Sequence, residues 1–216
     1  MNKENNTEHK NYQLAILVIL IMAVVIAVFL ILQGKVNSFV LINSYRSDML
    51  DTFFKYYTYT GDGIMWVPFA LILFFIKKEY LLPVLIALII STILAQLMKR
   101  VIFPNELRPY SLIAKNIQVY FVEGVKINQF HSFPSGHTTQ AFTMALLAAY
   151  FINKKSWSII LPLLALLTGY SRVYLAQHFV LDVFAGMLIA IFTVHLSLKI
   201  SVLIKKKKDP ENSASF

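Results

Sequence analysis

The sequence predicts an all-α membrane protein with six transmembrane helices. Hydrophobic residues make up 57% of the 216 residues, and the mean hydropathy is +0.63. Long apolar runs alternate with short polar stretches, and an apolar run of about 18 or more residues is long enough to span a bilayer. The chain contains no cysteine, which excludes disulfides, thiol catalysis and cysteine metal sites.

The apolar runs define the expected helices in order. The first is residues 13–32, which are apolar except for Gln13 and are followed by Gly34 and Asn37 as end signals. The other five are expected at about 63–76, 80–98, 135–152, 156–170 and 182–204. One membrane domain, residues 13–204, therefore lies between a polar N-terminal tail, 1–12, and a basic, polar C-terminal tail, 205–216.

Two segments between the helices are not simple turns. Residues 38–60 mix aromatic and charged side chains, which predicts an amphipathic segment lying at the membrane interface. The loop over residues 99–136 is too long to serve as a mere connection, and long loops usually carry function. The expected helices 135–152 and 156–170 hold about 16 apolar residues each, roughly 24 Å of helix, so we expect their outer ends to stop below the headgroups.

The net charge of +9 is explained by basic residues that flank the apolar runs. This distribution indicates membrane orientation and contact with the bilayer rather than binding of nucleic acid, and it identifies no protein partner. Both termini and the turns at 77–78 and 154–155 fall on one side, which carries eleven basic residues. We therefore expect cytoplasmic termini in the inner or plasma membrane, with the 38–60 segment and the long loop facing outside.

Three polar clusters fall at the outward ends of the helices. The first is Lys99–Arg100 with Arg108–Pro109, the second is Pro134–His137, and the third is Ser171–Asp182. Together they offer fixed cations, two histidines and a Ser-Gly turn that opens a helix. This combination is typical of a phosphate site, because arginines grip phosphate oxygens and free N–H groups at a helix start bind anions.

The third cluster also holds a nucleophile. His178 and Asp182 are four residues apart, so on a helix they would stack on one face. A carboxylate beside an imidazole orients it and raises its basicity, so His178 could attack phosphorus while His137 protonates the leaving oxygen.

The three clusters resemble the signature motifs of the type-2 phosphatidic acid phosphatase superfamily, Lys-x6-Arg-Pro, Pro-Ser-Gly-His and Ser-Arg-x5-His-x3-Asp. The second and third motifs are complete at 134–137 and 171–182. The first departs from the pattern, because Val101 stands seven residues before Arg108. The cation of that motif is then Lys99, with a small insertion before Arg108, or alternatively Arg100.

The resemblance implies hydrolysis of a phosphomonoester or pyrophosphate without metal or cofactor, through a phosphohistidine on His178. Asp182 would orient His178, and His137 would be the general acid. The phosphate would be held by five further residues, namely Lys99, Arg108, Ser135, Gly136 and Arg172.

The expected substrate is a membrane lipid phosphate that enters from the bilayer. The small, lysine-rich chain without cysteine is bacterial in style, which favours undecaprenyl pyrophosphate first and lipid A second. Phosphatidylglycerol phosphate and phosphatidic acid are the other candidates. A lipid-phosphate transporter or binder is the non-enzymatic alternative, although binding alone does not need the His178–Asp182 pair with His137.

Overall fold

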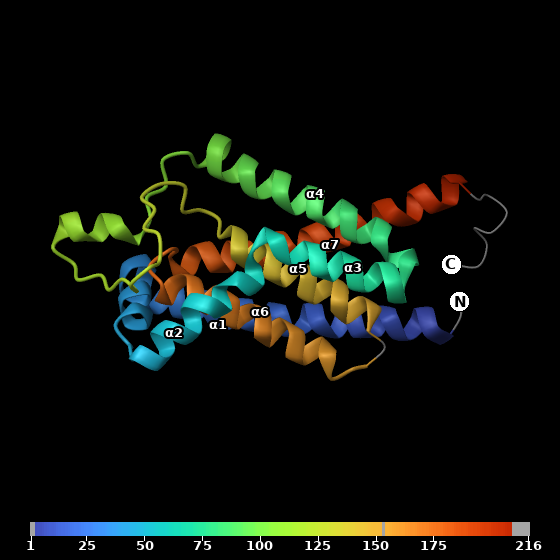
Figure 1. Ribbon diagram of the computed structural model, residues 1–216, viewed down its shortest axis with the longest axis horizontal. Helices are drawn as coiled ribbons and strands as arrows, with labels where there is room; N and C mark the ends of the chain where they lie inside the picture. Colours follow the sequence, from blue (N-terminus) through green and yellow to red (C-terminus); the bar gives the residue numbers. More distant parts are fainter. Residues whose placement is uncertain (1–2, 153, 209–216) are drawn as a thin grey trace.

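The computed structural model describes residues 3–152 and 154–208, and these residues form a helical bundle without strands (Figure 1). The start of α1 and the end of α7 lie at one end of the bundle, and the long loop after α4 lies at the other end. The outermost parts of the two expected tails, 1–2 and 209–216, lie outside the described residues.

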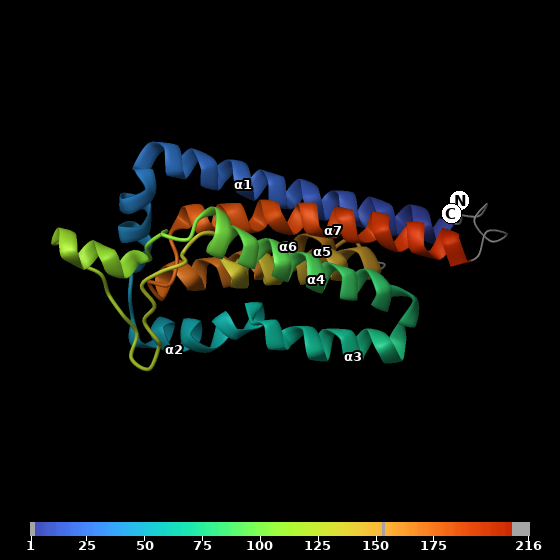
Figure 2. The ribbon, with the colours of Figure 1, turned by 90° about the horizontal axis from the view of Figure 1, so that it is seen from above.

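The first helix is longer than expected. It runs over Lys3–Asn43 and includes the polar residues before Tyr12. The sequence places its end at Gly34, and Gly34 does break it, with φ 72° and ψ 173°. The chain then resumes a helical path over residues 35–43, which Figure 2 shows turned away from the long axis of the bundle.

The segment expected at the membrane interface is joined to the following helix. Helix α2 (Asp48–Tyr57) leads through short 3₁₀ turns at Thr58–Gly61 and Gly63–Met65 into α3 (Trp66–Ile76). The two halves, 48–61 and 63–76, meet at a bend of 56°. Figure 2 shows them following one another along the side of the bundle.

The remaining helices occur where the sequence predicts them, with shifted ends. A 3₁₀ turn at Lys78–Tyr80 precedes α4 (Leu81–Leu97), which continues as a π-helical turn over Met98–Ile102. The long loop contains a 3₁₀ helix at Pro109–Lys115 and ends at α5 (Gly136–Phe151). The last two helices are α6 (Trp157–Tyr174) and α7 (Val180–Lys208).

Four helical stretches of the described chain are long and apolar enough to cross a membrane, and the bent α2–α3 pair makes a fifth if it is counted as one span. The four stretches are Thr7–Asn43, Lys78–Ile102, Trp157–Tyr174 and Val180–Lys207. The remaining expected span, 135–152, corresponds to α5, whose 16 residues cover only about 24 Å of the roughly 30 Å that a full crossing requires.

Helix α5 lies in the centre of the bundle and packs against α1, α4, α6 and α7. Its buried side chains include Phe142, Leu146 and Leu147, none of which is exposed to solvent. Because neighbours surround α5 on several sides, its first turn is held in a fixed position relative to the ends of α6 and α7.

Candidate active site

A tight turn between α6 and α7 carries the third motif. Ala176 has φ 55°, the left-handed conformation that often ends helices. Its amide donates to the carbonyl of Val173, while the amides of Gln177 and His178 both donate to the carbonyl of Arg172, at 2.9 and 3.1 Å. This is a Schellman turn, and it fixes the backbone of His178 against that of Arg172.

Asp182 lies in the first turn of α7 and holds the imidazole of His178. His178 Nδ1 is 3.2 Å from Asp182 Oδ2, and both side chains are almost completely buried. The sequence predicts the two residues stacked on one helix, but His178 lies in the turn before α7. The pair forms nevertheless, because Asp182 Oδ2 also accepts from the amide of Phe179 at 2.9 Å and so closes the start of the helix.

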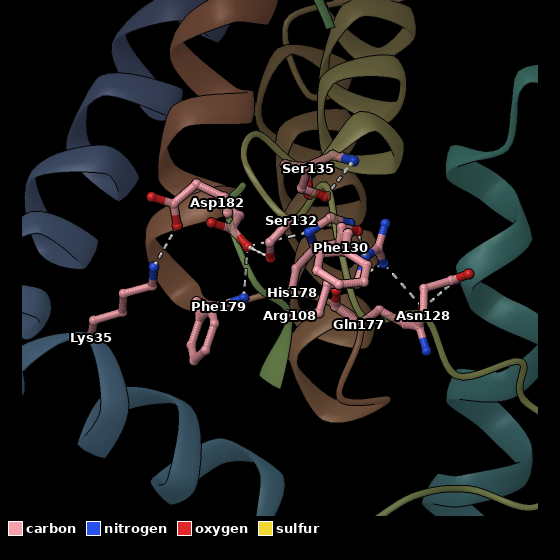
Figure 3. A network of polar contacts seen from close by, with 12 residues as sticks. Lys35, Arg108, Asn128, Phe130, Ser132, Ser135, Gln177, His178, Phe179 and Asp182 are labelled. Atoms are coloured by element: carbon pink, nitrogen blue, oxygen red, sulfur yellow. Dashed lines mark hydrogen bonds and ion pairs between the residues drawn. The ribbon is translucent and has the colours of Figure 1, made fainter. Parts of the chain in front are cut away.

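A third donor to Asp182 comes from outside the motifs. The hydroxyl of Ser132 donates to Asp182 Oδ2 at 2.5 Å, and Ser132 is fully buried (Figure 3). Ser132 lies in the loop just before the second motif and shows no recognisable pattern in the sequence. It is a site residue that sequence reasoning missed.

The second motif starts α5 and is attached to the third. Ser135 is the N-cap, and its hydroxyl oxygen accepts from the amide of Thr138. The amide of Ser135 itself donates to the backbone carbonyl of Asp182 at 3.0 Å. The start of α5 and the start of α7 are therefore bonded together, which brings His137 to the same end of the bundle as His178.

Arg108 reaches the site from the long loop and is oriented by main-chain oxygens. Its Nε donates to the carbonyl of Phe130 at 2.9 Å, and its Nη1 donates to the carbonyl of Gln177 at 2.9 Å and to the side-chain oxygen of Gln177 at 3.2 Å (Figure 3). The guanidinium is buried, and no carboxylate of the described residues is bonded to it. Gln177, the residue that holds it, is adjacent to His178 in the chain.

The two candidate cations of the first motif lie in different surroundings. A methyl group added to Gly136 would lie 3.6 Å from Lys99 Nζ, so the ammonium is beside the start of α5. Arg100 is exposed and donates to Gln96 on its own helix. The extra residues before Arg108 coincide with the π-helical turn at 98–102, and π turns accommodate additional residues within a helix.

Arg172 is in the last turn of α6 and is only 7% exposed. Its Nη1 donates to the hydroxyl of Thr58 at 2.8 Å. Its Nε is buried and has no hydrogen-bond partner among the described residues. An unpaired buried donor is costly, and the oxygen of a bound anion would satisfy it.

His137 faces the turn between the two halves of the bent α2–α3 pair. Its Nε2 lies 3.7 Å from Asp62 Oδ2. The neighbouring Gly61 allows this approach, because a Cβ at that position would be only 2.6 Å from the carbonyl oxygen of His137. The structure thus brings the turn that contains Asp62 to the site.

The electrostatic surroundings of His178 favour a neutral ring. Burial holds the pKa of His178 well below its usual range, and the cations Arg108, Lys99 and Arg172 lower it further. All three predicted cations therefore lie close enough to act on the same imidazole. No group of three or more histidine, aspartate or glutamate side chains suited to a metal ion occurs in the part of the chain that the structure describes.

The chain is similar to known proteins over most of this architecture. Residues 80–205 match the family model described as the PAP2 superfamily. An "Undecaprenyl-diphosphatase" of Sulfolobus acidocaldarius is 26% identical over 193 residues, which cover 85% of this chain and 89% of the relative. A "Lipid A 4'-phosphatase" of Porphyromonas gingivalis is 28% identical over 185 residues, which cover 82% and 77%.

A solved structure gives the same arrangement. The "Crystal structure of Aquifex aeolicus LpxE" matches with a TM-score of 0.69 and 36% sequence identity, over 76% of this chain and 94% of that chain. The family match begins just before α4 and ends near the end of α7, so it contains all three motifs.

Proposed function

Because this chain belongs to the PAP2 superfamily, we propose that it is an integral membrane phosphatase that hydrolyses a lipid phosphate or pyrophosphate. The observation that carries the proposal is the buried His178–Asp182 pair, 3.2 Å apart. Three cations lie around it, and among the described residues none of the three forms an ion pair with a carboxylate. A binding protein would need the cations but not an oriented imidazole.

In the first step, His178 attacks phosphorus through Nε2, since Nδ1 faces Asp182. The new N–P bond forms as the P–O bond to the lipid breaks, and the leaving oxygen takes a proton from His137. Burial and the cations Arg172, Lys99 and Arg108 lower the pKa of His137 to about 3, so the negative charge of the bound phosphate must offset them for His137 to carry that proton. The positive charge that develops on the ring of His178 is stabilised by the Asp182 carboxylate.

In the second step, water attacks the phosphohistidine. His137, now neutral, accepts a proton from the water, and the N–P bond breaks to release inorganic phosphate and restore His178. Lys99, Arg108 and Arg172 would hold the phosphoryl oxygens through both steps and stabilise the charge of the transition states. These cations supply charge stabilisation that a metal ion provides in other phosphatases, so we propose that the reaction does not require a metal.

The start of α5 would complete the phosphate pocket. Gly136 leaves space between the backbone and Lys99, and the free N–H groups of the first helical turn suit an anion. Ser135 would act through its cap, which holds this turn in place. Asp62 would be a positioning residue that orients His137 toward the leaving oxygen.

The substrate class follows from the relatives and from the membrane helices. Undecaprenyl pyrophosphate is our first choice, because a relative named as an undecaprenyl-diphosphatase aligns over 85% of the chain. Lipid A is the second, supported by the lipid A 4'-phosphatase relative. We also propose cytoplasmic termini and a site that faces the outside or periplasm, on the basis of the lysines near the termini.

The test is phosphate release by the purified full-length protein in detergent with a chelator. The panel contains undecaprenyl pyrophosphate, lipid A, phosphatidylglycerol phosphate and phosphatidic acid. His178→Ala is the inactive variant, and His195→Ala is the matched control, because His195 is exposed and about four turns along α7 from the site.

We expect release from one lipid with the wild type and with His195→Ala, and none with His178→Ala. Release that survives in His178→Ala would overturn the phosphohistidine mechanism. Lipid binding without release from any substrate would support a binder or transporter instead.

A further inference from the structure

An apolar groove of about 320 Å³ runs along the side of the bundle between α3, α5 and α6. Its floor is formed by three alanines of α5, Ala141, Ala145 and Ala148. Two of its lining residues, Ile72 and Leu164, are exposed on the outside of the bundle. The groove therefore opens sideways, at the depth of the membrane-spanning helices.

The few hydroxyl groups that line the groove are already bonded within the protein. Tyr57 donates to the carbonyl of Leu164 at 2.9 Å, and Thr60 donates to the carbonyl of Tyr57 at 2.8 Å. Thr168 lies 2.8 Å from the Thr60 hydroxyl. Because these hydroxyl groups already have hydrogen-bond partners, the groove has few polar groups that could bind water, and it suits a hydrocarbon ligand.

One end of the groove reaches the candidate active site. Ala141 is one helical turn beyond His137 on α5, and Thr168 is one turn before Arg172 on α6. Gly61 lies against both helices, because a Cβ at this position would be 2.6 Å from the His137 carbonyl oxygen and 2.7 Å from Thr168 Cγ2. From Ala141 to Ala148 the floor extends for about 10 Å away from the site.

We propose that this groove binds the hydrocarbon chain nearest the phosphate of the lipid substrate, with the phosphate placed at His178. The inference rests on the proposed function and deepens it, because it names the part of the site that selects a long-chain phosphate over a soluble one. The alanine floor determines specificity, since any larger side chain there would fill the space that the chain occupies.

The test compares Ala145→Phe with the wild type in binding two probes, dodecyl phosphate and methyl phosphate. Each probe competes with p-nitrophenyl phosphate in the hydrolysis assay, and its binding is also measured by calorimetry with His178→Ala added to each protein, so that the probes are not hydrolysed. Burial of one methylene group contributes about fourfold to affinity. We expect Ala145→Phe to weaken binding of dodecyl phosphate by about tenfold or more and to leave methyl phosphate within about twofold.

Two further variants keep the result interpretable. Ile93→Phe places the same ring on an exposed position of α4 outside the groove, and it should bind both probes as the wild type does. Ala148→Leu fills the groove with a smaller side chain and replaces Ala145→Phe if that variant does not fold.

Unchanged dodecyl phosphate binding in the filled variants would show that the groove holds only ordinary bilayer lipid. An equal loss for both probes would show damage to the phosphate site. Failure of the wild type to hydrolyse any substrate would contradict the proposed function, while the calorimetric comparison would still decide whether the groove binds the chain.

Discussion

His137 Nε2 and Asp62 Oδ2 lie 3.7 Å apart, although one side chain begins α5 and the other belongs to the turn before α3. The contact makes the bent α2–α3 pair part of the site. It also gives the proposed general acid a carboxylate partner of its own, separate from the Asp182 that serves His178.

Asp62→Asn should slow turnover of lipid substrates by about tenfold, as part of the 10²–10⁴-fold that general acid catalysis contributes. Hydrolysis of p-nitrophenyl phosphate should change little, because its leaving group needs no proton. The measurement is kcat for both substrates, with exposed Asp48→Asn as the control. An equal loss on both would mean that Asp62 acts on the fold or on phosphate binding.

Asp182→Asn should lower kcat by about 10³-fold or more, because the imidazole loses the group that orients it and stabilises its charge. The phosphoryl-enzyme supplies a second measurement. Labelled substrate mixed with the wild type and quenched in base should leave phosphate on His178, and His178→Ala should carry none. Label retained by His178→Ala would place the nucleophile elsewhere.

Ser132→Ala removes one of the hydrogen bonds that Asp182 Oδ2 accepts. A hydrogen bond to a charged group contributes about 1.5–3 kcal/mol, so we expect kcat to fall by about ten- to a hundredfold with little change in KM. Exposed Ser44→Ala serves as the control. Unaltered kcat would show that the amide of Phe179 suffices to hold the carboxylate.

Lys99→Ala should weaken inhibition by vanadate, a phosphate analogue, by about tenfold or more, since it removes a cation next to Gly136. Arg100→Ala should leave inhibition unchanged within about twofold, because Arg100 is exposed and bonded to Gln96. The measurement is the inhibition constant of vanadate for each of the two variants and for the wild type. The reverse order of effects would assign the first motif to Arg100.

His178 should make the folded state sensitive to acid. Its pKa is well below the usual value when folded, so below about pH 6.5 only the unfolded chain gains the proton. The contribution of neutral His178 to the free energy of unfolding is fully present above that pH. It is lost as the pH falls, by up to about 1.4 kcal/mol per pH unit. The melting temperature of His178→Gln minus that of the wild type should therefore increase as the pH is lowered from 7.5 to 5. A difference that stays constant over this range would contradict the prediction.

Most features that can be predicted from this sequence are encoded by residues close together in the chain. Apolar runs predict the helices, and the motif resemblance singles out His137, Arg172, His178 and Asp182, because each motif is a short continuous stretch of the chain. The motifs also placed these residues at one end of the bundle, where the structure brings them together.

Other contacts depend on segments that only tertiary packing brings together. Thr58 meets Arg172 across 114 positions and Gln177 meets Arg108 across 69, and no local spacing encodes either pair. The contacts of the 38–60 segment are another example. Its aromatic and charged residues fit an interfacial helix, but their packing against α6 is decided by the fold.

The turn at Ala176 has a consequence for the entropy of catalysis. Since the carbonyl of Arg172 accepts from the amide of His178, the backbone of a proposed phosphate ligand and that of the proposed nucleophile are joined directly by a hydrogen bond across the turn. Such a pair needs little reorganisation when substrate arrives. The ordering of these two groups is then completed during folding of the protein and not during each turnover.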